Sequence, residues 1–247
     1  MTGEAAIVVD AAGQRFGTRT IFENVSFTVA TGEVFVVLGG SGCGKSTLLK
    51  QMIGLLPPTQ GRISVRGHDV VTEVDAVRRD IGVMFQSGAL FGSMTLLDNV
   101  MLPLAMFTDL PARARAEIAR IKLALVGLAD AINLLPSEIS GGMAKRAAIA
   151  RALALDPPIL FLDEPSAGLD PITGAGLDRL ILDLRAALDC TFVVVSHELQ
   201  SIFAIADRCV MLDRAAKGMI ALGVPRDLQR TSDHPTVRAF FNREAEA

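Results

Sequence analysis

The chain has 247 residues, enough for one large domain or two small ones with a sizeable buried core. It carries 24 Lys and Arg against 27 Asp and Glu, a formal net charge of −3, which argues against general binding to nucleic acids or anionic lipid surfaces. Hydrophobic residues make up 50%, yet the longest aliphatic stretches are far shorter than the roughly 18 to 20 apolar residues that span a bilayer.

The N-terminal segment and the cysteines indicate where the protein resides. No charged and then apolar leader opens the chain, because Glu4 and Asp10 flank a strand-like segment. The three cysteines lack the paired spacing of a disulfide framework. We therefore expect a cytosolic location.

The first third of the chain alternates between strand patterns and a glycine-rich loop. Every second residue is apolar in 5–10 and in 25–29, which predicts an antiparallel N-terminal sheet. Residues 34–38 form a continuous apolar run, typical of a strand buried on both faces, and lead through the loop into a predicted helix at about 45–53. Residues 62–66 predict a returning edge strand.

The middle of the chain predicts a helical subdomain. Residues 112–128 and 143–155 are rich in Ala, Arg and Leu at helical spacing, and no strand pattern lies between them.

The last part of the chain alternates strands with helices, which predicts a parallel sheet of βαβ units. The predicted strands are 159–162, 191–195 and 208–212, and the predicted helices are 174–188, 199–206 and, in the tail, 236–242.

Residues 39–46, GGSGCGKS, fit the pattern G-x-x-x-x-G-K-[ST] between a buried strand and a helix, the context of a phosphate-binding loop (P-loop). Glycines let backbone N–H groups turn toward a triphosphate, and the helix N-terminus adds its positive dipole end. Lys45 would reach the β- and γ-phosphates and Ser46 would bind Mg²⁺, whereas an ordinary glycine-rich turn would explain neither residue. The predicted nucleotide-binding residues here are Gly39, Gly40, Ser41, Gly42, Cys43, Gly44, Lys45, Ser46 and Thr47.

Asp163 and Glu164 end the apolar strand at 159–162. A nucleotide site with Mg²⁺ needs one acidic group for the metal and another to polarise the attacking water, and we assign Asp163 and Glu164 to these roles in turn. The alternative is a solvated strand end.

A second helix N-terminus suited to an anion lies at Ser140, Gly141 and Gly142. Residues 139–143 resemble the LSGGQ signature of ATP-binding-cassette (ABC) ATPases, with Ile for Leu and Met for Gln. In that family the signature of one subunit closes over the γ-phosphate held by the P-loop of another. The resemblance implies an ATP-sandwiched homodimer in which these three residues bind nucleotide, and the alternative is an ordinary helix cap.

Four further positions match motifs of the same family. Gln86 resembles the Q-loop glutamine, which senses Mg²⁺ and the permease, and Asp170 belongs to a segment, 166–170, similar to the D-loop that crosses the dimer interface. His197 resembles the switch histidine that contacts the γ-phosphate, although a lone histidine after a strand is more often a satisfied polar group. Phe16 lies where the family stacks an aromatic ring on adenine.

The resemblance therefore implies one set of functional residues. Glu164, His197 and Gln86 would be catalytic, Ser46, Gln86 and Asp163 would hold Mg²⁺, and Phe16 and Asp170 would join the nucleotide site. Phe22 and Phe27 are alternatives to Phe16.

A narrower resemblance connects the chain with the ATPases of MCE-associated, Mla-like lipid transporters. It rests on residues 85–91, 93–100 followed by 103–104, 140–146 and 235–241. It implies a phospholipid or related lipid as cargo, a multi-spanning permease, an MCE-domain protein and a small STAS-like regulatory partner. The alternatives are another cargo such as an amino acid or a drug, a non-transport ABC protein acting on DNA or ribosomes, and a P-loop kinase or GTPase, which would leave the signature unexplained.

We therefore expect an α/β P-loop NTPase of the ABC type, a single domain over 1–247. Its nucleotide-binding core comprises about 5–86 and 156–222 with an antiparallel β subdomain, and its inserted helical subdomain comprises about 87–155, followed by a tail at 223–247. It would act as a Mg²⁺-dependent ATPase on the cytoplasmic face of the membrane and bind no nucleic acid.

The candidate permease contact is the segment 88–104. Its apolar residues Leu90, Phe91, Met94 and Leu96 are candidates for the contact or, alternatively, for the core of the helical subdomain.

Overall fold

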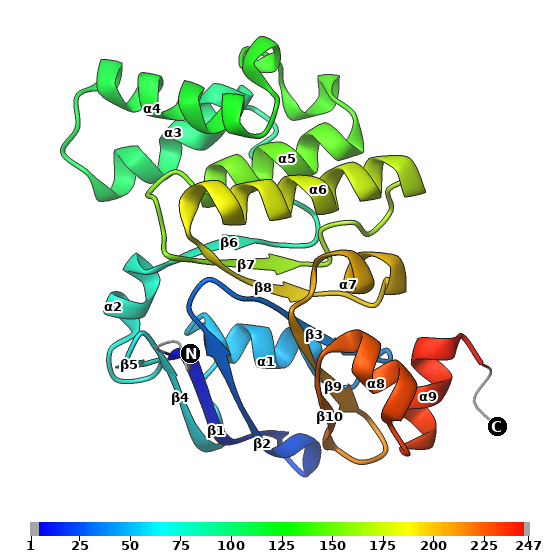
Figure 1. The fold of residues 1–247 in the computed structure, drawn as a ribbon. Coiled ribbons are helices and arrows are strands. Elements are labelled where there is room, and N and C mark those ends of the chain that lie inside the picture. Colours follow the sequence, from blue (N-terminus) through cyan, green and yellow to red (C-terminus); the bar gives the residue numbers. More distant parts are fainter. Residues whose placement is uncertain (1–4, 245–247) are drawn as a thin grey trace.

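The computed structural model describes residues 5–244, which fold into two β-sheets and several helical layers (Figure 1). The N-terminal sheet is antiparallel, with the strand order β2-β1-β4-β5. Its strands are β1 (Ala5–Phe16), β2 (Arg19–Ala30), β4 (Gln60–Val65) and β5 (His68–Asp69). The predicted antiparallel sheet is confirmed.

Two details of this sheet differ from the prediction. Strand β1 continues to Phe16, because its pairing with β2 shifts between Val9 and Ala12, where Ala11 has a φ of 46°. Such a bulge breaks the apolar alternation on which the predicted end at residue 10 rested. Strand β4 was wrongly predicted as an edge strand, because the short strand β5 pairs outside it, with His68 opposite Val65.

The second sheet lies at the centre of the molecule and has the order β10-β9-β3-β8-β7-β6. Its strands are β3 (Val34–Gly39), β6 (Ile81–Met84), β7 (Ile159–Asp163), β8 (Thr191–Val195), β9 (Arg208–Asp213) and β10 (Gly218–Gly223). The five strands β9, β3, β8, β7 and β6, in this order across the sheet, pair parallel with their neighbours, whereas β10 pairs antiparallel with β9. The parallel core is confirmed. The prediction missed β6, which has only four residues, and β10, which a glycine begins and ends.

Each face of the central sheet has its own hydrophobic core. In β3, Val36 and Leu38 contribute to one core and Phe35 and Val37 to the other, and all four are fully buried. Helix α1 (Lys45–Met52) packs in the core of Phe35, together with the antiparallel sheet. The opposite core contains α6 (Pro171–Leu188), α7 (Leu199–Ile205) and the helical subdomain. Burial on both faces is the reason for the continuous apolar run in β3.

The helical subdomain lies above strands β6 and β7 in Figure 1. It consists of the helices α3 (Leu96–Phe107), α4 (Ala112–Leu125) and α5 (Gly141–Ala152), with the short 3-10 turns η1 (Ala129–Ala131) and η2 (Pro136–Glu138). Helix α3 was missed by the prediction, although Thr95 and Asp98 form a reciprocal capping box at its start, a signal that is local in the sequence. The predicted fold class is confirmed.

The segment 88–104 divides between surface and core. Leu96 is fully buried, so of the two alternatives its place is in the core of the helical subdomain. Leu90 is partly buried and packs on the same core, and Met94 is also partly buried. Phe91 is 50% exposed.

The remaining helices are short. They are α2 (Val74–Arg79), α8 (Pro225–Thr231) and α9 (Pro235–Asn242). Helix α9 confirms the predicted tail helix and packs on α7, since the ring centroids of Phe241 and Phe203 are 5.6 Å apart. Across residues 5–244, none of the helices combines the length and the apolar character that a membrane crossing requires.

Candidate active site

The glycine-rich loop joins the end of β3 to the start of α1. Gly39 has a φ of 143°, and a β-carbon there would lie 2.2 Å from the carbonyl oxygen of Leu212. Gly44 has a φ of 106°, and a β-carbon there would lie 2.7 Å from the Phe22 ring. Both positions thus require glycine. Because Gly44 is also the N-cap, no side chain caps the first N–H groups of α1, which suits them to phosphate oxygens.

A cavity of about 350 Å³ adjoins the loop. It is lined by Phe16, Arg19, Ile21, Gly42, Gly44, Lys45, Ser46 and Thr47. Phe16 is 50% exposed at the end of β1, whereas the alternatives Phe22 and Phe27 are buried in the core. The structure thus brings Phe16 and the loop together. Arg19 was missed by sequence reasoning, although a cation three residues after a candidate adenine-stacking ring is a usable signal.

Lys45 lies against the loop itself. Its Nζ donates to the carbonyl oxygens of Gly39 (2.7 Å) and Gly40 (3.1 Å). The ammonium therefore lies next to the backbone N–H groups of the loop. A phosphate bound there would accept hydrogen bonds both from the ammonium and from these N–H groups.

Asp163 and Glu164 lie at the same edge of the sheet as the loop. Val37 of β3 and Asp163 of β7 both pair with Val195 of β8, which places the carboxyl ends of the three strands side by side. Burial raises the pKa of Asp163, and the Glu164 carboxylate raises it further, against the opposing effect of nearby lysines. Among the described residues, Asp163 Oδ1 is buried without a hydrogen-bond partner. A buried carboxylate oxygen without a donor is suited to a cation.

Glu164 and His197 contact each other directly. His197 Nδ1 lies 2.9 Å from Oε1 and 2.8 Å from Oε2 of Glu164, which is only 8% exposed. Glu164 has a φ of 49°, a conformation that costs a non-glycine residue free energy and that recurs at functional sites. Sequence analysis predicted both residues as catalytic, and only the fold reveals their contact.

Gln86 reaches the same edge through strand β6. Met84 of β6 pairs with Leu162 of β7, so Gln86 and Glu164, each two residues further along, follow neighbouring strand ends. Gln86 is exposed.

The signature segment begins helix α5. The Ser140 hydroxyl accepts a hydrogen bond from Met143 N at 3.3 Å and thus serves as the N-cap, the alternative considered from the sequence. Ser140 and Gly141 are nevertheless exposed. Gly142 faces helix α6, where a β-carbon would lie 2.5 Å from Thr173 Cγ2. Since α5 and α1 pack on opposite faces of the central sheet, the signature and the P-loop helix of one chain belong to different layers.

Asp170 is the N-cap of helix α6. Its carboxylate accepts from the backbone N–H groups of Ile172 and Thr173, both at 3.1 Å, and from the Thr173 hydroxyl at 2.5 Å. These hydrogen bonds, the hydroxyl first, lower the pKa of Asp170. A role of Asp170 in nucleotide binding stays a prediction.

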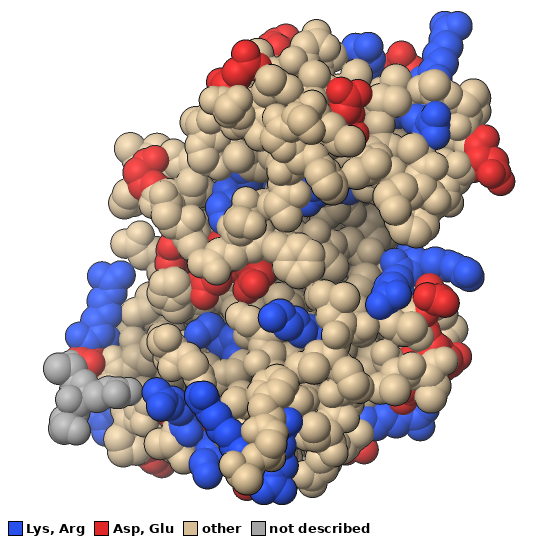
Figure 2. Space-filling model, turned by 180° about the vertical axis from the view of Figure 1, so that it is seen from behind, with Lys and Arg blue, Asp and Glu red and all other residues tan. Residues whose placement is uncertain are grey.

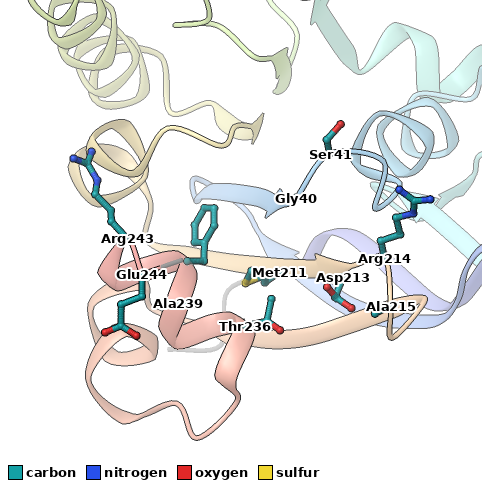
Figure 3. A pocket seen from close by; sticks show the side chains of 11 residues that line it. Gly40, Ser41, Met211, Asp213, Arg214, Ala215, Thr236, Ala239, Arg243 and Glu244 are labelled. Carbon is teal, nitrogen blue, oxygen red and sulfur yellow. The ribbon is translucent and has the colours of Figure 1, made fainter. Parts of the chain in front are cut away.

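A larger cavity, of about 880 Å³, adjoins the beginning of the P-loop (Figure 3). Gly40 and Ser41 line one side, the turn of the β9–β10 hairpin another, and helix α9 with Arg243 and Glu244 a third. Lys45 and Ser46, the residues predicted to bind the phosphates and Mg²⁺, line the smaller cavity instead. Figure 2 shows acidic and basic side chains in small interspersed groups on one face of the molecule.

The donor set fits Mg²⁺. Asp163 offers an unpartnered oxygen, Ser46 an exposed hydroxyl at the start of α1, and Gln86 an exposed amide. Between residues 5 and 244, no group of three or more His, Cys, Asp or Glu is arranged to hold a metal ion. Mg²⁺ needs no such cage, since it is commonly bound by one or two carboxylates plus the phosphates of a nucleotide.

A P-loop, a carboxylate pair at a parallel-sheet edge and an inserted helical subdomain with a signature segment define a nucleotide-binding protein of the ATP-binding-cassette type. A family model described as ABC transporter matches residues 22–167, more than half of the chain. The chain therefore belongs to the ABC transporter family, and the predicted resemblance is confirmed.

Curated relatives include ATP-binding proteins of two transport systems. The intermembrane phospholipid transport system ATP-binding protein MlaF of Escherichia coli K12 is 42% identical over 248 aligned positions, covering 98% of this chain and 91% of MlaF. A probable ribonucleotide transport ATP-binding protein, mkl, of Mycobacterium tuberculosis is 45% identical over 241 positions, 96% of this chain. The chain spans only 66% of the length of that relative. The resemblance to Mla-like ATPases is thus confirmed.

Solved structures share the fold. CbiO1 of Clostridium perfringens, part of the ABC transporter complex cbiONQ, superposes with a TM-score of 0.84 at 25% identity, covering 93% of this chain and 92% of its own. A dimeric ATP-binding cassette in a post-hydrolysis state bound to ADP and Pi has a TM-score of 0.78 at 30% identity, covering 88% of this chain and 98% of its own.

Proposed function

We propose that this protein binds ATP with Mg²⁺ and hydrolyses it to drive transport through a membrane permease. The observation that carries the proposal is the meeting, at one sheet edge, of the P-loop with a carboxylate pair in which one buried oxygen has no partner. A phosphate site beside a cation site is what a nucleotide with its metal requires.

Each residue of the site has a task in this chemistry. Lys45 and the backbone N–H groups of the P-loop would bind the β- and γ-phosphates, while Ser46, Gln86 and Asp163 would hold Mg²⁺. Bound Mg²⁺ neutralises charge on the phosphates. Glu164 would accept a proton from the attacking water, and its contact with His197 would orient the carboxylate.

We infer that two chains act together. Within one chain, α1 and α5 pack on opposite faces of the sheet, so the exposed Ser140 and Gly141 are suited to the nucleotide of a second copy. The structural relative that was solved as a dimer with ADP and Pi supports this arrangement. The proposal keeps the predicted division into a core (5–86 and 156–222), a helical signature subdomain (87–155) and a tail (223–247).

The proposed cargo is a phospholipid or a related lipid. The names of the relatives differ on this point, since MlaF is described for phospholipid and mkl for ribonucleotide transport. The match to MlaF covers 91% of that protein against 66% of mkl, which favours the lipid. The partners would be a multi-spanning permease, an MCE-domain protein and a small STAS-like protein, at the cytoplasmic face of the membrane.

One preparation tests both halves of the proposal. The tagged chain is purified from membranes, its bound proteins and lipids are identified, and its ATPase activity is compared with that of Glu164→Gln. Glu164→Gln keeps the shape but cannot accept the proton, so we expect ATP binding without turnover. Equal turnover by both proteins would refute the catalytic assignment. Copurification of a permease without lipid would refute the lipid cargo.

A further inference from the structure

Two cations of helix α5, the buried Lys145 and the half-buried Arg151, bind the main chain that follows strand β6. Lys145 Nζ donates to the carbonyl oxygen of Gln86 at 2.5 Å. Arg151 donates through Nη1 to Ala89 O (2.7 Å) and through Nη2 to Gly88 O (2.8 Å). The Q-loop segment, residues 86–89, is therefore held by the helix that begins at the signature.

The next residues are held by helix α3. Asn99, fully buried, accepts from Phe91 N (2.8 Å) and donates to Phe91 O (3.1 Å) and Thr95 O (3.0 Å). The chain from Gln86 to Thr95 is thus hydrogen-bonded to the helical subdomain and should move with it.

Lys145 differs from Arg151 and Asn99 because it also contacts Glu164, the residue predicted to activate water. Its Nζ donates to the carbonyl oxygen of Glu164 at 3.3 Å. Lys145 is only 9% exposed, and its ammonium thus connects the signature helix with the main chains of Gln86 and Glu164. The Glu164 main chain has the unfavourable φ of 49°, so a donor at its carbonyl oxygen helps to fix the direction of its side chain.

Burying the charge of Lys145 costs free energy, and a role in packing alone would not explain that cost. Burial lowers the pKa of Lys145, and the carboxylates of Glu164, Asp163 and Glu198 oppose this effect. Both hydrogen-bonded acceptors are neutral carbonyl groups, so within residues 5–244 no direct ion pair offsets the desolvation of the ammonium. An apolar side chain of similar length would fill the space at lower cost.

We propose that Lys145 is a positioning residue for ATP hydrolysis, one that makes the water-activating Glu164 move together with the signature helix and the Q-loop segment. This inference rests on the proposed function, in which Glu164 accepts the proton. It assigns to Lys145 the link between Glu164 and the signature helix.

The test compares Lys145→Met with a matched control, Lys122→Met, in the full chain. Lys122 is a second buried lysine of the helical subdomain, on α4, and its side chain is 6% exposed. Its partner Asp156 has a side chain that is 71% exposed, so the control substitution leaves no buried charge unpaired.

For Lys145→Met we expect kcat to fall by about tenfold to a hundredfold, with the KM for ATP nearly unchanged. A displaced Glu164 stabilises the transition state less, whereas the P-loop, which binds the ATP, is not altered. Hydrogen exchange should rise in peptides covering 85–92 and 163–168. Lys145→Arg, which keeps a cation with several donors, should recover most of kcat. Lys122→Met should keep kcat and the exchange of both peptides.

Three outcomes would overturn the inference: a wild-type kcat for Lys145→Met, an exchange increase spread evenly over the chain, or effects equal to those of Lys122→Met. A wild-type protein without Glu164-dependent ATPase activity would instead refute the proposed function. The exchange comparison would still decide in that case whether Lys145 links the two segments.

Discussion

Phe91 and Leu96 lie five residues apart in the segment predicted to contact the permease, and the structure gives them opposite environments. Leu96 is fully buried, so Leu96→Ala should cost about 2–5 kcal/mol of stability. At about 2–4 °C per kcal/mol for a chain of this size, the melting temperature should fall by about 4–20 °C. Phe91 is 50% exposed, so Phe91→Ala should lose about half of the roughly 1.5–3 kcal/mol of full burial, or about 1 kcal/mol.

The functional effects should have the reverse order. Phe91→Ala removes an exposed aromatic side chain of the kind that anchors interfaces, while the Asn99 hydrogen bonds to its main chain remain. We expect this variant to melt nearly as wild type and to lose the permease during purification from membranes. Leu96→Ala should melt lower, and its folded fraction should still copurify with the permease. A fall of more than about 10 °C for Phe91→Ala, or an unchanged melt for Leu96→Ala, would refute the division of this segment into surface and core.

The other predictions concern the nucleotide, the dimer and pH. Lys45→Ala should lose most ATP binding, measured by calorimetric titration, because it removes the cation beside the phosphates, and near-normal ATPase activity would contradict the P-loop assignment. Ser140→Arg should bind ATP without turnover, since the side chain would fill the space for the partner's γ-phosphate. Mixing Ser140→Arg with Lys45→Ala chains should restore partial activity, and no recovery in confirmed mixed dimers would count against shared sites. Hydrogen bonds from the backbone N–H groups of Thr72 and Val71, and from Arg62, lower the pKa of Asp69 to about 2, below its ordinary value. The ionised carboxylate therefore stabilises the fold at neutral pH. This contribution is lost as the pH falls from about 4 to about 2. Asp69→Asn should therefore be less stable than wild type by about 1–2 kcal/mol in urea unfolding at pH 6, and a difference that persists at pH 2 would refute this assignment.

The elements that could be predicted were those whose signal is local. The P-loop needs glycine at 39 and 44, a lysine and a serine within eight consecutive residues, because one turn of backbone forms the whole phosphate site. The buried strands of the parallel sheet were likewise predictable, because burial on both faces demands a continuous apolar run.

Elements with a weak or interrupted local signal were missed. The extension of β1 to Phe16 follows a bulge, and β6 is too short for its periodicity to be recognised. Leu96 shows the same limit for single residues. Its neighbours in sequence include the exposed Phe91, and only the packing of the helical subdomain decides which of the two side chains is buried.

By itself, the sequence determined the class of fold, the phosphate-binding loop and the residue types of the site, because each depends on short stretches with a fixed order. Tertiary structure decided which of these residues meet. His197 contacts Glu164 although 33 residues separate them, and Lys145 bonds to Gln86 across 59 residues, because parallel strands bring their carboxyl ends to one edge and the helical subdomain folds back over it. Such contacts depend on strand order and helix packing, which are properties of the whole chain and not of any segment within it.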